Sequence, residues 1–273
     1  MDALSNDLLF WLSLGLKLAL TAGIVVSASV VVERAGPLIG ALVVTLPVTV
    51  WPAYLFLALD HDAAYLISSA HSGLAVNAVS GVFMLTYLLL AHKRGVVLSL
   101  GLAVASWFVL ATLVRAYEWT LQSAGLLNLL VYPICIVLSR RYREMEAPRI
   151  KRQWYELPLR TVLVCALMGG VLLLSHWADP GITGMLAVYP ISTTCTMLIV
   201  HTRMGGRVSA AVIANGLFGL FGLGLGLFAM AWTILPGGVP LALALLLAVP
   251  VAWNFSIWLY RQRAREPALG KQP

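Results

Sequence analysis

The residues best suited to bind a ligand are hydroxyl side chains that flank two prolines inside apolar segments. These residues are Thr45, Pro47 and Thr49 in one segment, and Tyr189, Pro190, Ser192 and Thr193 in the other. Proline lacks the backbone N–H and clashes with the carbonyl four residues earlier, so each segment should break near its middle. In a membrane, irregular backbone is tolerated where protein buries it or where it lines a polar cavity. We therefore expect a substrate site at the breaks; the alternative is a simple kink whose Ser and Thr side chains bond back to the helix.

Polar residues on neighbouring apolar segments could complete this site. They are His71, Ser72, Asn77 and Asn215. An imidazole titrates near neutral pH, so His71 could couple a proton to the process, although it could equally be a packing histidine.

Two cations lie within apolar segments, Lys17 and Arg160. Each could extend its charge to the lipid headgroups, or could face inward and bind substrate. All 11 acidic residues fall at segment ends or in loops, so we expect no carboxylate to neutralise an inward cation. Two inward cations would favour an anionic substrate, helped by the positive N-terminal ends of broken helices.

The sequence offers little for catalysis. It contains no phosphate-binding loop, no metal-ligand spacing and no nucleophile–base spacing. We therefore expect no catalytic residue, no metal, no cofactor and no enzymatic activity. The rival in this class is an enzyme that modifies a lipid within the membrane, with His71 or His176 as the acid–base group.

Composition indicates an all-α polytopic membrane protein, since 60% of the residues are hydrophobic and 11% are charged. A span needs about 20 mostly apolar residues. Nine candidates meet this requirement: 8–32, 37–59, 63–91, 95–115, 119–139, 157–177, 181–201, 207–231 and 237–260.

The charges of the connections predict the orientation. Fifteen Lys and Arg residues fall in one alternate set of connections and only Arg115 in the other. The basic side is cytoplasmic, which places the N-terminus outside and the C-terminus inside. The net charge of +7 is thus explained by orientation in a bacterial inner membrane, and we expect membrane lipids rather than nucleic acid as partners.

The chain also nearly repeats itself at one offset of 143 residues. Matched pairs are Trp11 and Trp154, Pro37 and Pro180, Pro47 and Pro190, Gly73 and Gly216, Gly81 and Gly224, and Gly95 and Gly238. The repeat covers four spans, and one unpaired span between the copies turns the second copy upside down. The sequence therefore predicts inverted 4+1+4 repeats: 1–116, a linking helix and basic loop at 117–150, and 151–273.

One stretch supports a resemblance to a known family. The run from Glu33 to Leu42, with Thr45 to Thr49, is similar to the small four-span GlpM-like proteins of bacterial inner membranes. The 4+1+4 plan also resembles the drug/metabolite transporter superfamily, which has 5+5 inverted repeats. Neither resemblance implies a substrate.

These features favour a secondary transporter or exporter of a small anionic molecule that works by alternating access. The alternative is a membrane-embedded partner or assembly protein, with the duplication kept for stability. Glycines in 207–231, including Gly222 and Gly226, favour close helix packing and could also support a homo-oligomer.

Overall fold

The computed structural model describes residues 2–34, 49–143 and 153–269, which form helices and no strand. The all-helical prediction is thus confirmed for these ranges. The elements are α1 (Asp2–Arg34), α3 (Val50–Asp60), α4 (Ala63–Ala91), α5 (Val96–Arg115), α6 (Leu121–Leu138), the 3₁₀ turn η1 (Arg140–Tyr142), α7 (Glu156–Leu174), α8 (Pro180–Ala187), α9 (Ile191–Met204) and α10 (Gly206–Leu269).

Seven of the described segments are long and apolar enough to cross a membrane, so the chain is a multi-pass helical membrane protein by composition and length. One of these segments, Gly206–Tyr260, lies in α10 and is not one straight helix. Gly238 has a φ of 79°, a conformation that favours glycine, and it divides α10 into two arms. The helix α3 has only 11 residues and is too short to cross alone.

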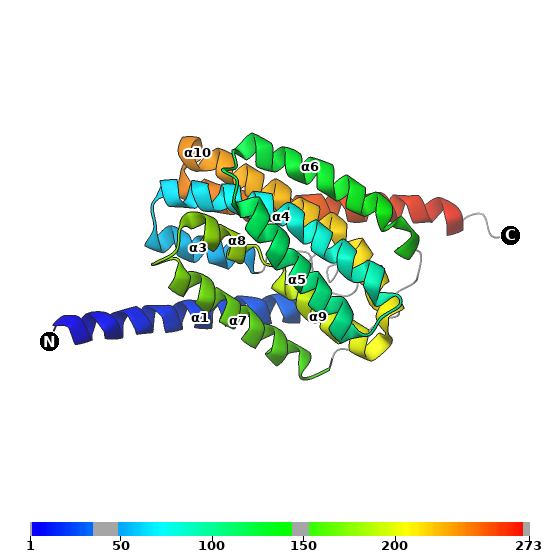
Figure 1. Ribbon diagram of the computed structural model, residues 1–273, viewed down its shortest axis with the longest axis horizontal. Helices are drawn as coiled ribbons and strands as arrows, with labels where there is room; N and C mark the ends of the chain where they lie inside the picture. Colours follow the sequence, from blue (N-terminus) through cyan, green and yellow to red (C-terminus); the bar gives the residue numbers. More distant parts are fainter. Residues whose placement is uncertain (1, 35–48, 144–152, 270–273) are drawn as a thin grey trace.

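The helices run roughly along the long axis of the molecule, and their connections gather at its two ends (Figure 1). The α3–α4, α5–α6 and α7–α8 connections lie at the end where α1 begins. The α4–α5 and α9–α10 connections lie at the opposite end, where α10 also finishes.

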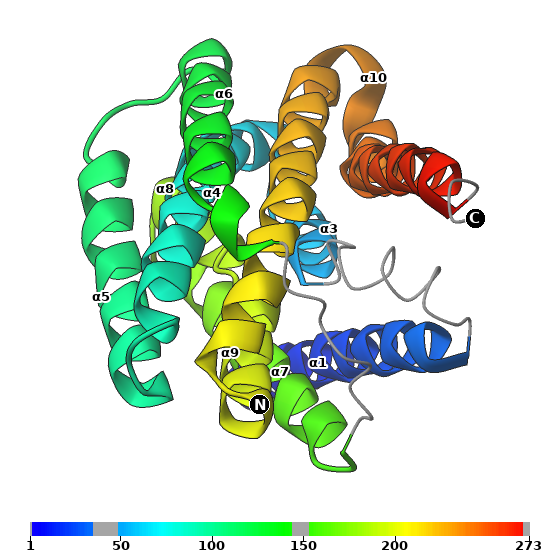
Figure 2. The ribbon, with the colours of Figure 1, turned by 90° about the vertical axis from the view of Figure 1, so that its right-hand side faces the viewer.

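The helix α4 forms the centre of the bundle, and most of its residues are buried. Figure 2 shows it between α5, α6 and the first arm of α10, and it also packs closely against α8. Contact with α8 is closest at Gly184, where an added Cβ would lie 2.0 Å from the carbonyl oxygen of Ser69. Only glycine permits this approach, which fixes the position of α8 on α4.

A sealed polar cluster joins α4 to α6 and α10. Asn77 Nδ2 donates to Asn128 Oδ1 at 3.0 Å and to the Leu220 carbonyl at 3.2 Å, while Tyr132 donates to the Asn77 carbonyl at 2.9 Å. All of these side chains are buried. They hold three helices in register.

The two arms of α10 pack on each other through the predicted glycine motif. A Cβ at Gly222 would lie 2.5 Å from Trp253, and one at Gly226 would lie 2.7 Å from Pro250. These two glycines therefore serve contacts within the chain, and the homo-oligomer stays a prediction.

Candidate functional site

The predicted break at Pro190 is confirmed: α8 ends at Ala187 and α9 begins at Ile191. Pro190 has no N–H to offer to the Leu186 carbonyl, which instead accepts from the Tyr189 N–H at 3.1 Å. The corresponding residues Thr45 and Pro47 lie outside the described residues.

This break opens onto a cavity of about 130 Å³. Its walls come from α3, α4, α7, α9, the α8–α9 break and the first arm of α10. The lining residues are Thr49, Val50, Met84, Arg160, Val188, Tyr189, Pro190, Ser192, Thr193, Thr196, Val212, Ile213, Gly216, Gly219, Leu220 and Leu223.

One wall of the cavity is polar and carries a positive charge. Arg160 extends from α7, and its Nη2 donates to Thr196 Oγ1 at 3.4 Å. The Thr196 hydroxyl in turn donates to the Ser192 carbonyl at 2.9 Å, one turn back along α9. Of the described lining residues, Arg160 carries the one formal charge. A negatively charged group entering the cavity would find a guanidinium and several hydroxyls.

Tyr189 is held rigidly at the break. Its ring lies 4.8 Å from that of Trp107 and 5.9 Å from that of Phe108, both on α5, and 9% of the residue is exposed. Thr194 on α9 contacts its hydroxyl at 3.4 Å. The neighbouring helix therefore fixes the shape of the cavity on this side.

The remaining lining residues are mostly apolar, and most of them come from the first arm of α10. Gly216 and Gly219 keep this arm thin, and a Cβ at Gly216 would lie 3.1 Å from the Met84 terminal methyl group. The cavity is thus amphipathic, because one cation and several hydroxyls share it with apolar side chains.

The structure brings together six of the predicted site residues in this cavity: Thr49, Arg160, Tyr189, Pro190, Ser192 and Thr193. His71 lies half-buried on α4 and is not a lining residue. Asn77 belongs to the sealed cluster, and Asn215 donates to the Ala211 carbonyl of its own helix at 3.0 Å.

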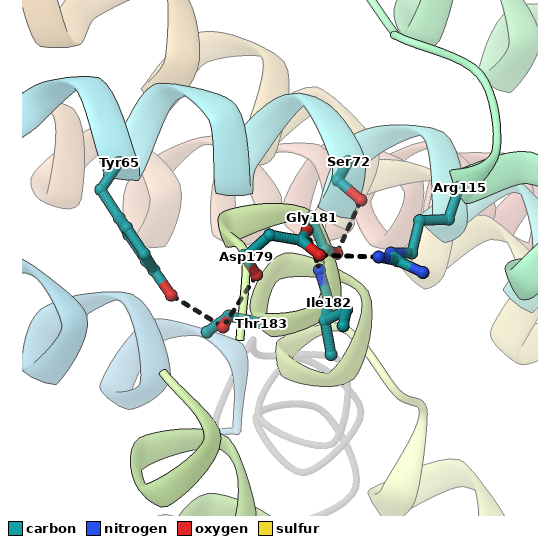
Figure 3. Close-up of polar contacts among 7 residues, drawn as sticks. All are labelled: Tyr65, Ser72, Arg115, Asp179, Gly181, Ile182 and Thr183. Carbon is teal, nitrogen blue, oxygen red and sulfur yellow. Dashed lines mark hydrogen bonds and ion pairs between the residues drawn. The ribbon is translucent and has the colours of Figure 1, made fainter. Parts of the chain in front are cut away.

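Ser72, another predicted site residue, lies at the N-terminal end of α8 (Figure 3), where its hydroxyl donates to the Gly181 carbonyl at 2.9 Å. Asp179 caps this helix by accepting from the Ile182 N–H at 3.1 Å, and Arg115 Nη2 contacts its carboxylate at 2.6 Å. Burial raises the pKa of Asp179, but these donors outweigh it and the net pKa falls below its usual value.

Lys17 corrects one expectation. We expected no carboxylate to neutralise Lys17 if it faced inward, yet Lys17 Nζ contacts both Asp60 carboxylate oxygens, at 2.5 and 2.6 Å. Asp60 is the last residue of α3, and the long lysine side chain reaches it from the middle of α1. Lys17 therefore lies in an ion pair and is not among the residues that line the cavity.

Sequence reasoning omitted the apolar half of the site. Met84, Ile213 and Leu223 look like any other core residues of a membrane helix, and only their packing reveals that they face a cavity. Gly216 carried a signal, because it matches Gly73 in the repeat. Thr196 also carried a signal in the sequence, because it is a hydroxyl residue that follows the break, one turn after Ser192.

No family model, curated protein or solved structure matches this chain. The resemblance to GlpM-like proteins stays a prediction, and function is argued from the site itself.

Proposed function

We propose that this chain is a secondary transporter of a small anionic solute, and that the cavity at the α8–α9 break is its substrate site. The observation that carries the proposal is the convergence of Arg160, the hydroxyls of α9, the α8–α9 break and the start of α3 on one cavity. A cavity with a cation and hydroxyls at an interrupted helix is typical of the substrate sites of transporters.

The chemistry of the cavity favours an anion. A guanidinium can bind a carboxylate or phosphate through two parallel N–H donors. The N-terminal end of α9 adds a partial positive charge, because its first turn directs N–H groups toward the break. The volume of about 130 Å³ would accommodate a solute of up to about ten non-hydrogen atoms.

Alternating access is supported by the repeat. The Asn77–Leu220 hydrogen bond joins residues 143 apart, the same offset that relates the two halves of the sequence. The first helices of the proposed repeats, α1 and α7, also pack against each other. Such pairing of equivalent elements is expected where a pseudo-two-fold axis crosses the molecule.

The proposed topology has nine spans. The two arms of α10 count as two spans, and α8 and α9 together count as one broken span. The helix α3 belongs to the second expected span, 37–59. With the basic connections on the cytoplasmic side, the N-terminus is outside and the α9–α10 connection is inside.

Transport by purified protein in liposomes tests the proposal. The measurement is uptake of labelled short carboxylates and phosphate, with choline as a cationic control. We expect saturable uptake of at least one anion, which an excess of the unlabelled anion abolishes. Uptake equal to that of protein-free liposomes for every anion, or saturable uptake of choline alone, would contradict the proposal.

A further inference from the structure

Two shielded ion pairs connect helices at opposite ends of the bundle. Lys17 of α1 contacts Asp60 at the end of α3, and Glu156 of α7 contacts Arg203 near the end of α9. The side chains of Lys17 and Asp60 are 13% and 21% exposed, and those of Arg203 and Glu156 are 21% and 14% exposed. Figure 1 shows the α3–α4 and α9–α10 connections, next to which these pairs lie, at opposite ends of the molecule.

One member of each pair occupies the same place in the sequence repeat, and the other member lies within one helical turn of the matching place. Asp60 falls on Arg203 at the offset of 143 residues, and Lys17 falls on Arg160, one turn after Glu156. Each pair therefore links the first helix of a proposed repeat to the end of its second span. The charges are reversed between the copies, so the same connection is made twice with opposite polarity.

Each pair is joined to the cavity by a short helix. The helix α3 begins beside Thr49 and Val50, which line the cavity, and ends at Asp60. The helix α9 begins after Pro190, which also lines the cavity, and carries Arg203 near its other end. Helices of 11 and 14 residues span about 16 and 21 Å at 1.5 Å per residue.

We propose that these ion pairs are the two gates of the transport cycle: Lys17–Asp60 closes the outer side and Glu156–Arg203 closes the inner side. This inference rests on the proposed function and its orientation. Opening to one side separates one pair and swings its short helix away from the cavity, while the other pair stays closed. Both pairs are formed here, so this structure corresponds to a state closed at both gates.

Loss of one partner leaves the other charge shielded from water without its counter-ion, which destabilises the closed gate. Asp60→Asn should thus favour the state open to the outside, and Arg203→Gln should favour the state open to the inside. A change of about 1.4 kcal/mol in the relative free energy of the two states would alter their ratio about tenfold.

The test follows the accessibility of one cysteine in the cavity. The three native cysteines, Cys135, Cys165 and Cys195, are replaced by alanine, and Thr193→Cys supplies the probe. An impermeant thiol reagent is applied to intact cells and to inside-out vesicles. We expect Asp60→Asn to raise the ratio of outside to inside labelling about tenfold, and Arg203→Gln to lower it by a similar factor.

Exchange of the two charges of a pair distinguishes the loss of a gate from a general loss of packing. Lys17→Asp with Asp60→Lys, and Glu156→Arg with Arg203→Glu, should each return the ratio to that of the parent. The control is Arg115→Gln, which breaks a more exposed pair, with side chains 36% and 51% exposed, and should leave the ratio within about twofold.

Labelling that changes equally from both sides in either variant, or a charge exchange that fails to restore the ratio, would overturn the gates. Flux is measured separately on the parent protein. Normal anion flux with unchanged sidedness would refute the gates alone, whereas absence of flux would refute the proposed function.

Discussion

The two ends of α8 both carry polar residues next to a proline, and they differ in what those residues contact. At the N-terminal end, Asp179 caps the helix and bonds to Arg115, while the Gly181 carbonyl accepts from Ser72 (Figure 3). At the C-terminal end, Tyr189 and Pro190 break the helix and line a cavity. One end is closed by partners within the protein, and the other lines a cavity.

This difference shows that polarity inside a membrane segment does not by itself mark a binding site. Ser72 and Ser192 are the same residue type, each in or next to an interrupted segment. Ser72 meets a carbonyl of the neighbouring helix, whereas Ser192 lines a space shared with Arg160. Whether a polar group holds helices together or binds a ligand depends on which helix faces it.

The largest effect is expected at the middle of α8, which positions both ends. Gly184→Ala would place a methyl group 2.0 Å from the Ser69 carbonyl oxygen, so α8 must separate from α4. We expect a loss of about 3 kcal/mol or more, since backbone cannot yield as a flexible side chain does. The measurements are the yield of monodisperse protein and its melting temperature in detergent.

The matched control is Gly170→Ala on α7, where an added Cβ meets nothing within 4 Å. This change should be neutral or stabilising, because alanine favours a helix more than glycine does. Equal melting temperatures for the two variants would mean that the contact between α4 and α8 is not tight.

The next largest effect is expected in the cavity at the C-terminal end of α8. Arg160→Gln removes the cation of the cavity, and the lost charge-assisted contact corresponds to about 1.5–3 kcal/mol, or roughly ten- to a hundredfold in substrate affinity. Arg160→Lys should recover part of this affinity, because it keeps the charge and loses the two-pronged geometry. The measurement is the concentration dependence of anion uptake, and unchanged affinity in Arg160→Gln would remove the cavity from consideration as an anion site.

Two smaller effects distinguish the two ends of α8 directly. Ser72→Ala removes one interhelical hydrogen bond and should cost about 0.5–1.5 kcal/mol of stability without changing substrate affinity. Ser192→Ala should do the reverse, lowering affinity by about two- to tenfold with little change in melting temperature. If Ser72→Ala lowers affinity more than Ser192→Ala, the assignment of the two ends is wrong.

The helical segments and the break at Pro190 were predictable, because both follow from local chemistry. Apolar segment length predicts spans, and a proline without an N–H predicts an interruption wherever it falls. Arg160 and the hydroxyls after Pro190 were identified for the same reason: their cost in lipid is a property of each residue alone.

Partners from distant segments could not be predicted from one sequence. The pairing of Lys17 with Asp60, and the burial of Asn77 against Asn128, depend on which helices lie side by side. The apolar wall formed by Met84 and Leu223 was equally hidden, since such residues are common throughout the chain. The identity of the neighbours is a tertiary property that local spacing does not contain.

The smallest effect concerns the pH dependence of the closed end. The pKa of Asp179 lies below its usual value in the folded protein, because Arg115 and two backbone N–H groups outweigh the opposing effect of burial. The ionised form therefore contributes stability above the unfolded pKa of about 3.9, and this contribution is lost as pH falls through the folded pKa.

Because the side chains of Arg115 and Asp179 are 36% and 51% exposed, solvent screening holds the contribution of the pair below about 1 kcal/mol. Arg115→Gln should lower the melting temperature slightly at pH 6, and this difference should shrink as the pH falls below the unfolded pKa and disappear once it is below the lowered folded pKa of Asp179. The control is Arg94→Gln, an exposed arginine at the opposite end of the bundle, which should show no such convergence. A difference between Arg115→Gln and the parent that stays constant from pH 6 down to the lowest pH at which both proteins remain folded would mean that Arg115 acts through packing, and that the cap of α8 does not depend on its charge.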